Sequence, residues 1–315
     1  MARILVTGGT GFLGSHMSHY LAGEGHDVVA TYLDPPEASV RTRLGTASTV
    51  HLDVRDIAAV RRVLEETRPD VVYHFAGQAY VVPSTKDPIG TFQVNLLGTL
   101  HFLETLARTR PRTAFAFAGS GTEYGAPDRV PTPEDAELRP TSPYASSKTA
   151  ADLLCYQYFA SDQLPVFRYR IFGTTGVGKT GDVCNDFASQ IARIERGEIS
   201  GPMRVGTLDV RRDIADVRDA VRAMVRVVER GTPGTAYNIG SGEATPVRAI
   251  LQTLRSLAHG PVDVEVDPTR FRQVDEPVHL GEISRLKALG WTPEHPMESS
   301  LRDILDFWRS RTSPP

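Results

Sequence analysis

The chain has 315 residues, of which 35 are Lys or Arg and 38 are Asp or Glu, so its net charge is −3. This length is enough to bury a large core in one domain or in two interleaved ones. The balanced charge argues against nucleic acid as the main partner. No apolar run approaches the roughly 20 residues that cross a bilayer, so we expect no membrane partner.

Neither the cysteines nor the histidines suggest a disulfide framework or a metal site. Cys155 and Cys184 are the only cysteines, which is too few for a disulfide framework and is typical of a reducing compartment. The scattered histidines form no metal-ligand spacing, so no metal is expected. We therefore expect a cytoplasmic protein without a metal centre.

In chain order, short apolar runs alternate with helical patterns through the first half. The predicted strands are 4–7, 28–32, 49–52, 71–75, 114–118 and 166–171. The predicted helices between them are 11–23, 57–67, 89–107 and 143–160. This alternation predicts an α/β fold, a doubly wound parallel sheet of the Rossmann type with helices on both faces.

The alternation ends after Phe172. A Gly-rich loop at 173–181 precedes predicted helices at 186–196, 216–230 and 300–310 and a late strand at 237–239. We predict that residues 1–172 and about 208–242 form the Rossmann domain. Residues 173–207 and 243–315 would form a smaller, interleaved C-terminal domain that binds the substrate.

A glycine-rich turn, TGGTGFLG at 7–14, joins the first predicted strand to the first helix. Glycines let the backbone turn tightly and approach a pyrophosphate, whose charge is favourable at a helix N-terminus. At this junction the motif predicts a dinucleotide site. Its residues are Gly8, Thr10, Gly11, Phe12, Leu13 and Gly14.

The adenosine end of that site carries an unusual residue at the end of the second strand. An acid that binds the ribose 2′-hydroxyl is common there, but this chain has Tyr32, and Asp34 comes two residues later. Arg41 or Arg43 is placed to pair with a 2′-phosphate, unless both are solvated loop residues. The sequence thus favours NADP(H), with NAD as the alternative.

The next predicted strand ends in a second acidic segment. Asp53, with Val54, is a candidate contact for the adenine amino group. Asp56 is expected to cap the following helix.

Tyr144 and Lys148 are four residues apart, so on a helix they share one face. An adjacent ammonium favours the phenolate, so we expect the tyrosine pKa to fall below about 10. Such a tyrosine exchanges a proton with an alcohol or sugar oxygen during hydride transfer. The alternative is a tyrosine packed over a solvated lysine, and the order of the surrounding motifs decides against it.

Together these motifs resemble the extended short-chain dehydrogenase/reductase family that modifies nucleotide sugars. The resemblance covers the Gly-rich turn, Asp53, the segment 74–78, Asn95-x-x-Gly98-Thr99, Ser120 and Tyr144-x-x-x-Lys148. It implies that Ser120, Tyr144 and Lys148 are catalytic. It also implies that Phe75, Ala76, Gly77, Gln78 and Asn95 line the cofactor. By the same resemblance, helices 89–107 and 143–160 would pair two subunits as a four-helix bundle.

The C-terminal half is most similar to enzymes of GDP-mannose-derived sugars, and within them to the 4-keto-6-deoxy-mannose reductases. The similar segments are 185–191, 204–208, 211–213, 270–275 and 289–293. The resemblance makes seven residues candidates for substrate binding, with the arginines clamping a diphosphate. They are Ser84, Thr122, Thr174, Asn185, Arg204, Arg212 and Arg272.

Three departures from the family pattern affect the expected reaction. Dehydratases of the family place acids directly after the catalytic serine or threonine, whereas this chain has Gly121 and Thr122. Glu123 comes one residue later and is expected to face away. The usual Phe-Asn-His-x-Gly-Pro loop reads FGTTGV at 172–177, and Arg-Pro-x-Asp reads RQVD at 272–275.

The expected function is therefore reduction of a 4-keto-6-deoxy nucleotide sugar, with a GDP-linked sugar favoured. An NAD-dependent 4-epimerase is the first alternative and a 4,6-dehydratase the second. A protein that binds NADP without turnover is a third, which the intact Ser120, Tyr144 and Lys148 disfavour.

Overall fold

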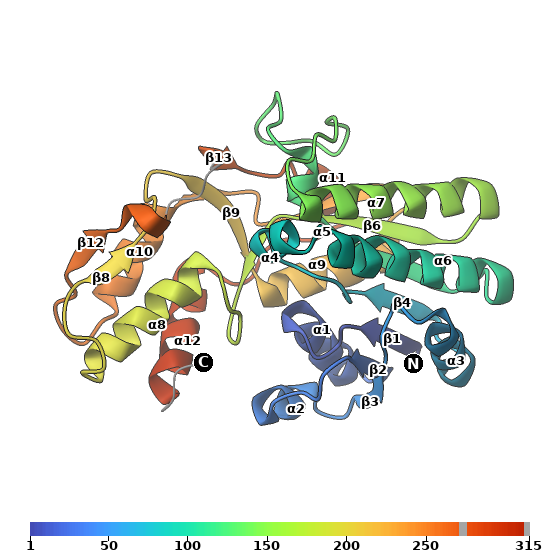
Figure 1. Cartoon of the computed structure of the whole chain (residues 1–315), viewed down its shortest axis with the longest axis horizontal. Helices are drawn as coiled ribbons and strands as arrows, with labels where there is room; N and C mark the ends of the chain where they lie inside the picture. The colour runs from blue at the N-terminus through green and yellow to red at the C-terminus, as the bar shows by residue number, and fades with distance from the viewer. Residues whose placement is uncertain (271–275, 312–315) are drawn as a thin grey trace.

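The computed structural model describes residues 1–270 and 276–311. A sheet of seven parallel strands runs through its larger part in the order β10-β6-β5-β4-β1-β2-β3 (Figure 1). The strands are β1 (Arg3–Thr7), β2 (Asp27–Tyr32), β3 (Ser48–His51), β4 (Val71–His74), β5 (Ala114–Ser120), β6 (Val166–Ile171) and β10 (Ala236–Ile239). The order reverses between β1 and β4, which is the position where doubly wound sheets bind dinucleotides. The predicted Rossmann-type fold is confirmed.

Helices cover both faces of this sheet. On one face α1 (Phe12–Gly23) and α9 (Val217–Arg230) contribute to a core with Met17, Tyr169 and Met224. On the other, α3 (Ile57–Thr67), α6 (Gly98–Thr109) and α7 (Pro143–Asp162) pack over Leu5, Phe115 and Val166. The apolar strands are therefore buried on both sides, as a parallel sheet requires.

The predicted helix 89–107 is interrupted. It consists of α5 (Pro88–Phe92), a π-helical turn η1 (Gln93–Leu97) and α6. Two short helices, α2 (Ala38–Leu44) and α4 (Val81–Lys86), lie in segments for which the sequence predicted no element. Neither reaches three turns, so each depends on tertiary contacts more than on its own propensity.

A second group of elements packs around its own core. It contains β7 (Gly173–Thr175), α8 (Val183–Glu195), β8 (Met203–Val205), β9 (Arg211–Asp216), β11 (Ala244–Pro246), α10 (Val247–Ser256), β12 (Val264–Val266), β13 (Val278–His279) and α12 (Met297–Ser310). Ile283, Leu286 and Trp291, around α11 (Ser284–Ala288), belong instead to the core of the large sheet. The segment around α11 thus packs against the large sheet again, after the second group of elements. The predicted domain boundaries stay a prediction.

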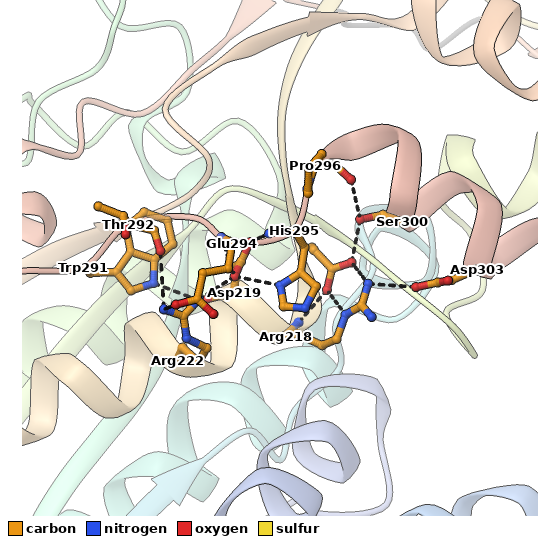
Figure 2. Close-up of polar contacts among 11 residues, drawn as sticks. Arg218, Asp219, Arg222, Trp291, Thr292, Glu294, His295, Pro296, Ser300 and Asp303 are labelled. Carbon is orange, nitrogen blue, oxygen red and sulfur yellow. Dashed lines mark hydrogen bonds and ion pairs between the residues drawn. The ribbon is translucent and has the colours of Figure 1, made fainter.

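Hydrogen bonds and an ion pair connect the start of α9 to the C-terminal segment (Figure 2). The Asp219 carboxylate accepts hydrogen bonds from the backbone N–H groups of Glu294 and His295. Its carbonyl oxygen accepts one from Trp291 Nε1 at 3.2 Å. Arg218 pairs with Asp303 of α12 at 2.9 Å. These contacts fix α12 beside the half of the molecule that contains the large sheet.

Candidate functional site

The Gly-rich turn between β1 and α1 is shaped by close packing at two glycines and is open at a third. A Cβ on Gly9 would lie 2.6 Å from Ala30 Cβ, and one on Gly14 would overlap the Gly8 carbonyl oxygen. Gly11 is exposed, and its Cβ would meet only the Gly8 carbonyl oxygen, at 3.2 Å. No side chain caps α1 at Gly11, so its first N–H groups are not satisfied by a capping side chain. The turn fits a dinucleotide pyrophosphate.

The adenosine end carries Tyr32 at the end of β2, with its ring 5.7 Å from that of His51. Asp53 is engaged by its neighbour, because Arg55 Nη2 lies 2.6 Å from its carboxylate and holds the carboxyl pKa below the usual range. An adenine amino group would have to share that carboxylate. Asp56 accepts from Ala58 N and Ala59 N and caps α3, as predicted.

Arg43 lies against α1 and does not extend freely into solvent. Its Nη1 donates to Ser15 Oγ at 3.1 Å and its Nη2 to the Val177 carbonyl oxygen at 3.2 Å. Both partners are neutral oxygens, so the guanidinium charge is retained near the Gly-rich turn. Arg41 is exposed and donates to the Pro36 carbonyl oxygen.

Asn95 connects the loop after β4 to helix α7. Its Oδ1 accepts from Gln78 N at 2.8 Å, and its Nδ2 donates to Ser147 Oγ at 2.9 Å. Ser147 Oγ in turn donates to the Tyr144 carbonyl oxygen at 2.7 Å. The π-helical turn η1 contains Asn95, and such turns are frequent at functional sites. A Cβ on Gly77 would lie 2.8 Å from Asn95 Oδ1, so this contact requires glycine.

Ser120 and Tyr144 meet at the end of β5. Ser120 Oγ lies 2.9 Å from Thr122 Oγ1. Burial raises the pKa of Tyr144 to about 12, although the nearby Ser120 side chain acts in the opposite direction. The expected fall of the tyrosine pKa is therefore not found in the protein alone.

Lys148 is held by β5 at the same strand end. Its Nζ donates a 2.8 Å hydrogen bond to the Ala118 carbonyl oxygen and lies 5.2 Å from the Phe117 ring centroid. Burial lowers the pKa of the ammonium to about 8, and Glu123 partly opposes that shift. The direction of the Tyr144 pKa is set by desolvation of the phenol itself.

The wall beside Ser120 contains two rings that the sequence analysis did not identify. A Cβ on Gly121 would lie 3.1 Å from both the Phe172 ring and His279 Cε1. The two rings are 4.6 Å apart, centroid to centroid. An acid at position 121 would have to displace them. Because His279 is brought there by pairing of β13 with β9, no local signal could have revealed it.

The side chain of Glu123 points into the interior, so it faces away from the Ser120 hydroxyl as expected. The reason differs, because residues 121–124 form a 3₁₀ turn, η2 (Gly121–Tyr124), and not a strand. Its carboxylate accepts a 2.7 Å hydrogen bond from Ser120 N. No carboxylate of residues 121–123 faces the Ser120 hydroxyl.

Three candidate substrate residues lie deeper than expected. Ser84 is fully buried and accepts from Tyr144 N at 3.1 Å, so it supports the start of α7. Thr174 is buried and bonded to Lys179. Asn185 departs most from the expectation, because its Nδ2 donates to the Gly176 carbonyl oxygen and its Oδ1 accepts from Trp308 Nε1 at 3.0 Å. A substrate contact through these residues stays a prediction.

The candidate arginines are on separate elements. Arg204 on β8 is 62% exposed and lies 3.7 Å from Asp267. Arg212 on β9 donates to the Glu276 carbonyl oxygen at 2.7 Å. Arg272 lies outside the described residues. Gly173 stands where the family has asparagine, and a Cβ there would overlap the Asp213 carbonyl oxygen. That glycine lets β7 pair closely with β9.

Residues 1–270 and 276–311 contain neither a membrane-spanning helix nor a metal-ligand cluster. None of their helices combines the length and apolarity needed to cross a bilayer. No group of three His, Cys, Asp or Glu side chains there is arranged to hold a metal ion.

Comparison with known proteins places this geometry in a family. The family model described as GDP-mannose 4,6 dehydratase matches residues 5–304. GDP-6-deoxy-D-mannose reductase of Pseudomonas aeruginosa is 34% identical over 314 residues, covering 98% of each chain.

Two solved structures are also similar. RMD from Pseudomonas aeruginosa, complexed with NADPH, has a TM-score of 0.86 and 32% identity over 99% of this chain and 100% of that one. The Thermus thermophilus UDP-glucose 4-epimerase complex with NAD has a TM-score of 0.86 and 29% identity, covering 98% and 99%. The chain is a member of the GDP-mannose 4,6-dehydratase family, within the extended short-chain dehydrogenases/reductases.

Proposed function

We propose that the protein is an NADPH-dependent reductase of a 4-keto-6-deoxy nucleotide sugar, with a GDP-linked sugar favoured. One observation carries the proposal: Ser120, Tyr144 and Lys148 come together at the end of β5, while residues 121 and 122 supply no acid and the Phe172 and His279 rings crowd position 121. The set supports hydride transfer with proton donation and offers no carboxylate at 121 or 122 for removal of water. The similarity to a GDP-6-deoxy-D-mannose reductase supports the substrate class.

In this assignment the bound nicotinamide supplies the hydride. The Ser120 hydroxyl binds the keto oxygen, and Tyr144 donates the phenolic proton to it. Lys148 supplies a positive charge one helical turn from Tyr144 and would bind the nicotinamide ribose. Asn95 and Ser147 hold the start of α7, so the phenol stays aimed at Ser120.

NADP(H) is the proposed cofactor, and NAD the alternative. Tyr32 gives no carboxylate to repel a 2′-phosphate, and Arg43 brings a cation to the nearby face of α1. The similar reductase structure holds NADPH, whereas the similar epimerase holds NAD.

The direct test follows the loss of NADPH absorbance with GDP-4-keto-6-deoxy-mannose and with its UDP and dTDP counterparts. Stoichiometric oxidation of NADPH with the GDP sugar is the expected result. No oxidation with any of them, by folded protein that binds NADPH, would refute the reductase.

A 4-epimerase is the second candidate, favoured by full-length similarity to the UDP-glucose 4-epimerase structure. It would use the same three residues and return the hydride to the opposite face of the sugar. Tightly retained NAD and interconversion of two sugars without net cofactor use would identify it.

We also propose a homodimer formed by α5, α6 and α7 of each subunit. Ile89, Leu97, Leu153 and Tyr156 are exposed on these helices and η1, at 72%, 44%, 56% and 49%. A pocket on this face is lined by Pro88, Ile89, Phe92, Gln93 and Leu97. Such an apolar surface is typical of a subunit interface. A cytoplasmic location belongs to the same proposal and is supported by the two free, buried cysteines.

A further inference from the structure

A strap formed by residues 176–181, between β7 and α8, contacts both α1 and the loop after β4. Near its start, the Val177 carbonyl oxygen lies 3.1 Å from His16 Nε2 of α1. The imidazole donates in this contact, because a carbonyl oxygen only accepts. Near its end, the Thr180 carbonyl oxygen accepts a 3.4 Å hydrogen bond from the Tyr80 hydroxyl. The strap therefore joins two segments that are far apart in the sequence.

The two segments that the strap joins lie on opposite sides of the dinucleotide site. The Gly-rich turn and α1 follow β1, whereas the loop that carries Gln78 and Tyr80 follows β4. β1 and β4 are neighbours at the position where the strand order reverses, and dinucleotides bind outside the carboxyl ends of the strands there. A segment bonded to both loops therefore crosses the opening between them.

The middle of the strap packs against the first residue of α1. Lys179 Nζ lies 5.3 Å from the centroid of the Phe12 ring. A Cβ on Gly176 would lie 3.6 Å from Phe12 Cζ. Phe12 directly follows the exposed Gly11, where the pyrophosphate of a dinucleotide is expected. The strap thus lies over the end of the helix at which the charged centre of the cofactor would bind.

The base of the strap is held more firmly than its tip. Asn185 Nδ2 of α8 donates to the Gly176 carbonyl oxygen at 3.2 Å. The Asp182 carboxylate accepts from Thr175 Oγ1 at 2.8 Å and from Asn185 N at 2.7 Å. These groups are buried or half-buried, whereas residues 180 and 181 are exposed and Tyr80 is 47% exposed. The strap is therefore anchored in the second group of elements, and its tip is held by solvent-accessible contacts.

Two glycines allow the tip of the strap to change conformation. Gly178 and Gly181 have φ angles of +87° and +75°, in the left-handed region, and they flank Lys179 and Thr180. Glycine moves between backbone conformations without a steric penalty, so these positions can absorb a large rotation. Val177 also borders a pocket of about 290 Å³ that is lined by residues of α1, α2, α9 and α12. The strap therefore has both hinges and space for movement.

We propose that the strap closes the dinucleotide site, and that the cofactor enters and leaves when the contacts of the strap with Tyr80 and His16 open. Closing segments of this kind set the rate of cofactor or product release in many enzymes. The proposal depends on dinucleotide binding and not on the identity of the sugar. Because the contacts join two parts of the protein, they must open for entry as well as for exit.

The test uses residues outside the proposed cofactor contacts. Arg43 Nη2 also donates to the Val177 carbonyl oxygen, but Arg43 is a proposed contact of the 2′-phosphate and is left intact. Tyr80→Phe keeps the ring and removes the bond to the strap. His16→Leu removes the bond to Val177. Tyr156→Phe on α7 is the matched control, because its ring is 49% exposed and far from residues 176–181 in the sequence.

Stopped-flow fluorescence of NADPH measures association and dissociation separately, and NADH serves as the probe if NADPH does not bind. The loss of one neutral hydrogen bond should raise the open fraction of the strap by roughly 2- to 12-fold. We expect Tyr80→Phe and His16→Leu each to speed both rates by that factor, so that Kd stays nearly constant. Tyr156→Phe should exchange the cofactor like the wild type.

Hydrogen exchange gives a second readout, which does not depend on the cofactor. The Lys179 N–H donates to the Gly176 carbonyl oxygen at 3.3 Å within the strap. Its exchange rate reports the open fraction, since local opening exposes the amide. In Tyr80→Phe it should rise by the same factor as the rate of cofactor dissociation.

Unchanged association and dissociation rates in both variants would overturn the proposal. Faster dissociation with unchanged association would also overturn it, because the strap would then be a cofactor contact and not a closing segment. Failure of the reductase proposal is distinguishable, because cofactor exchange is measurable in a protein that reduces no keto sugar.

Discussion

Asn95 Nδ2 donates a 2.9 Å hydrogen bond to Ser147 Oγ, which joins the π-helical turn η1 to helix α7. Asn95 Oδ1 also accepts from Gln78 N at 2.8 Å, so one amide connects the loop after β4 to α7. Because Ser147 Oγ donates to the Tyr144 carbonyl oxygen, the positions of Gln78 and Tyr144 are coupled through Asn95.

Tyr144→Phe should abolish proton donation and leave cofactor binding intact. General acid catalysis contributes about 10²- to 10⁴-fold, so we expect a loss of that size in kcat. Steady-state kinetics and NADPH fluorescence titration measure the two quantities. Tyr156→Phe is the matched control, because Tyr156 lies on the same helix and is 49% exposed. Equal losses in both variants would contradict the assigned role.

Gly121→Ala should destabilise the protein, because its Cβ would lie 3.1 Å from the Phe172 and His279 rings. Overpacking of this kind costs about 1 to 3 kcal/mol, measurable by urea unfolding. Gly23→Ala at the end of α1 is the control, since its Cβ meets nothing within 4 Å. Gly121→Asp should give no dehydratase activity toward GDP-mannose. If Gly121→Ala is as stable as the Gly23→Ala control, the Phe172 and His279 rings leave room for a Cβ at position 121.

Arg43→Ala should weaken NADPH binding by about 10- to 100-fold, the loss expected for a hydrogen bond to a charged group. NADH affinity should change little, because NADH lacks the 2′-phosphate. Arg41→Ala is the control from the same helix, α2, and its guanidinium bonds only a local carbonyl oxygen. Equal weakening of both cofactors would assign Arg43 to holding the Val177 loop.

Acid should destabilise the protein through His74. Burial lowers the pKa of His74 to about 3, so the folded state resists protonation at a pH where the unfolded chain accepts it. The contribution of the neutral His74 to the free energy of unfolding is fully present above the ordinary histidine pKa and is lost as the pH falls below it. A fall of two pH units below that pKa should lower the free energy of unfolding by about 2 to 3 kcal/mol.

Unfolding free energies at neutral and mildly acidic pH measure this slope. His74→Asn should flatten it. His259→Asn, which removes a ring of 74% side-chain exposure, should not. An unchanged slope in His74→Asn would mean that other groups carry the acid sensitivity.

Leu153→Asp should dissociate the proposed dimer, because it places a charge in the apolar face of α7. Light scattering over a concentration series would show a monomer for the variant and a dimer for the wild type. Val266→Asp, on exposed β12 of the other unit, should remain dimeric. A monomeric wild type would refute the four-helix bundle.

The sequence by itself determined the parallel sheet, the Gly-rich turn and the placement of Tyr144 and Lys148 on one helix. These depend on local periodicity and on spacings within one strand, turn or helix, and they hold in the structure. The cap at Asp56 is equally local and was predictable for the same reason.

Only the tertiary structure decided what surrounds these residues. His279 reaches Gly121 through a strand pairing between distant segments, and Arg170 meets Glu123 across β6 and η2. The direction of the Tyr144 pKa was also decided there, because desolvation depends on all the atoms that pack around a group. Sequence spacing specifies which groups are neighbours along one element, whereas burial and long-range pairing set their charge and their role.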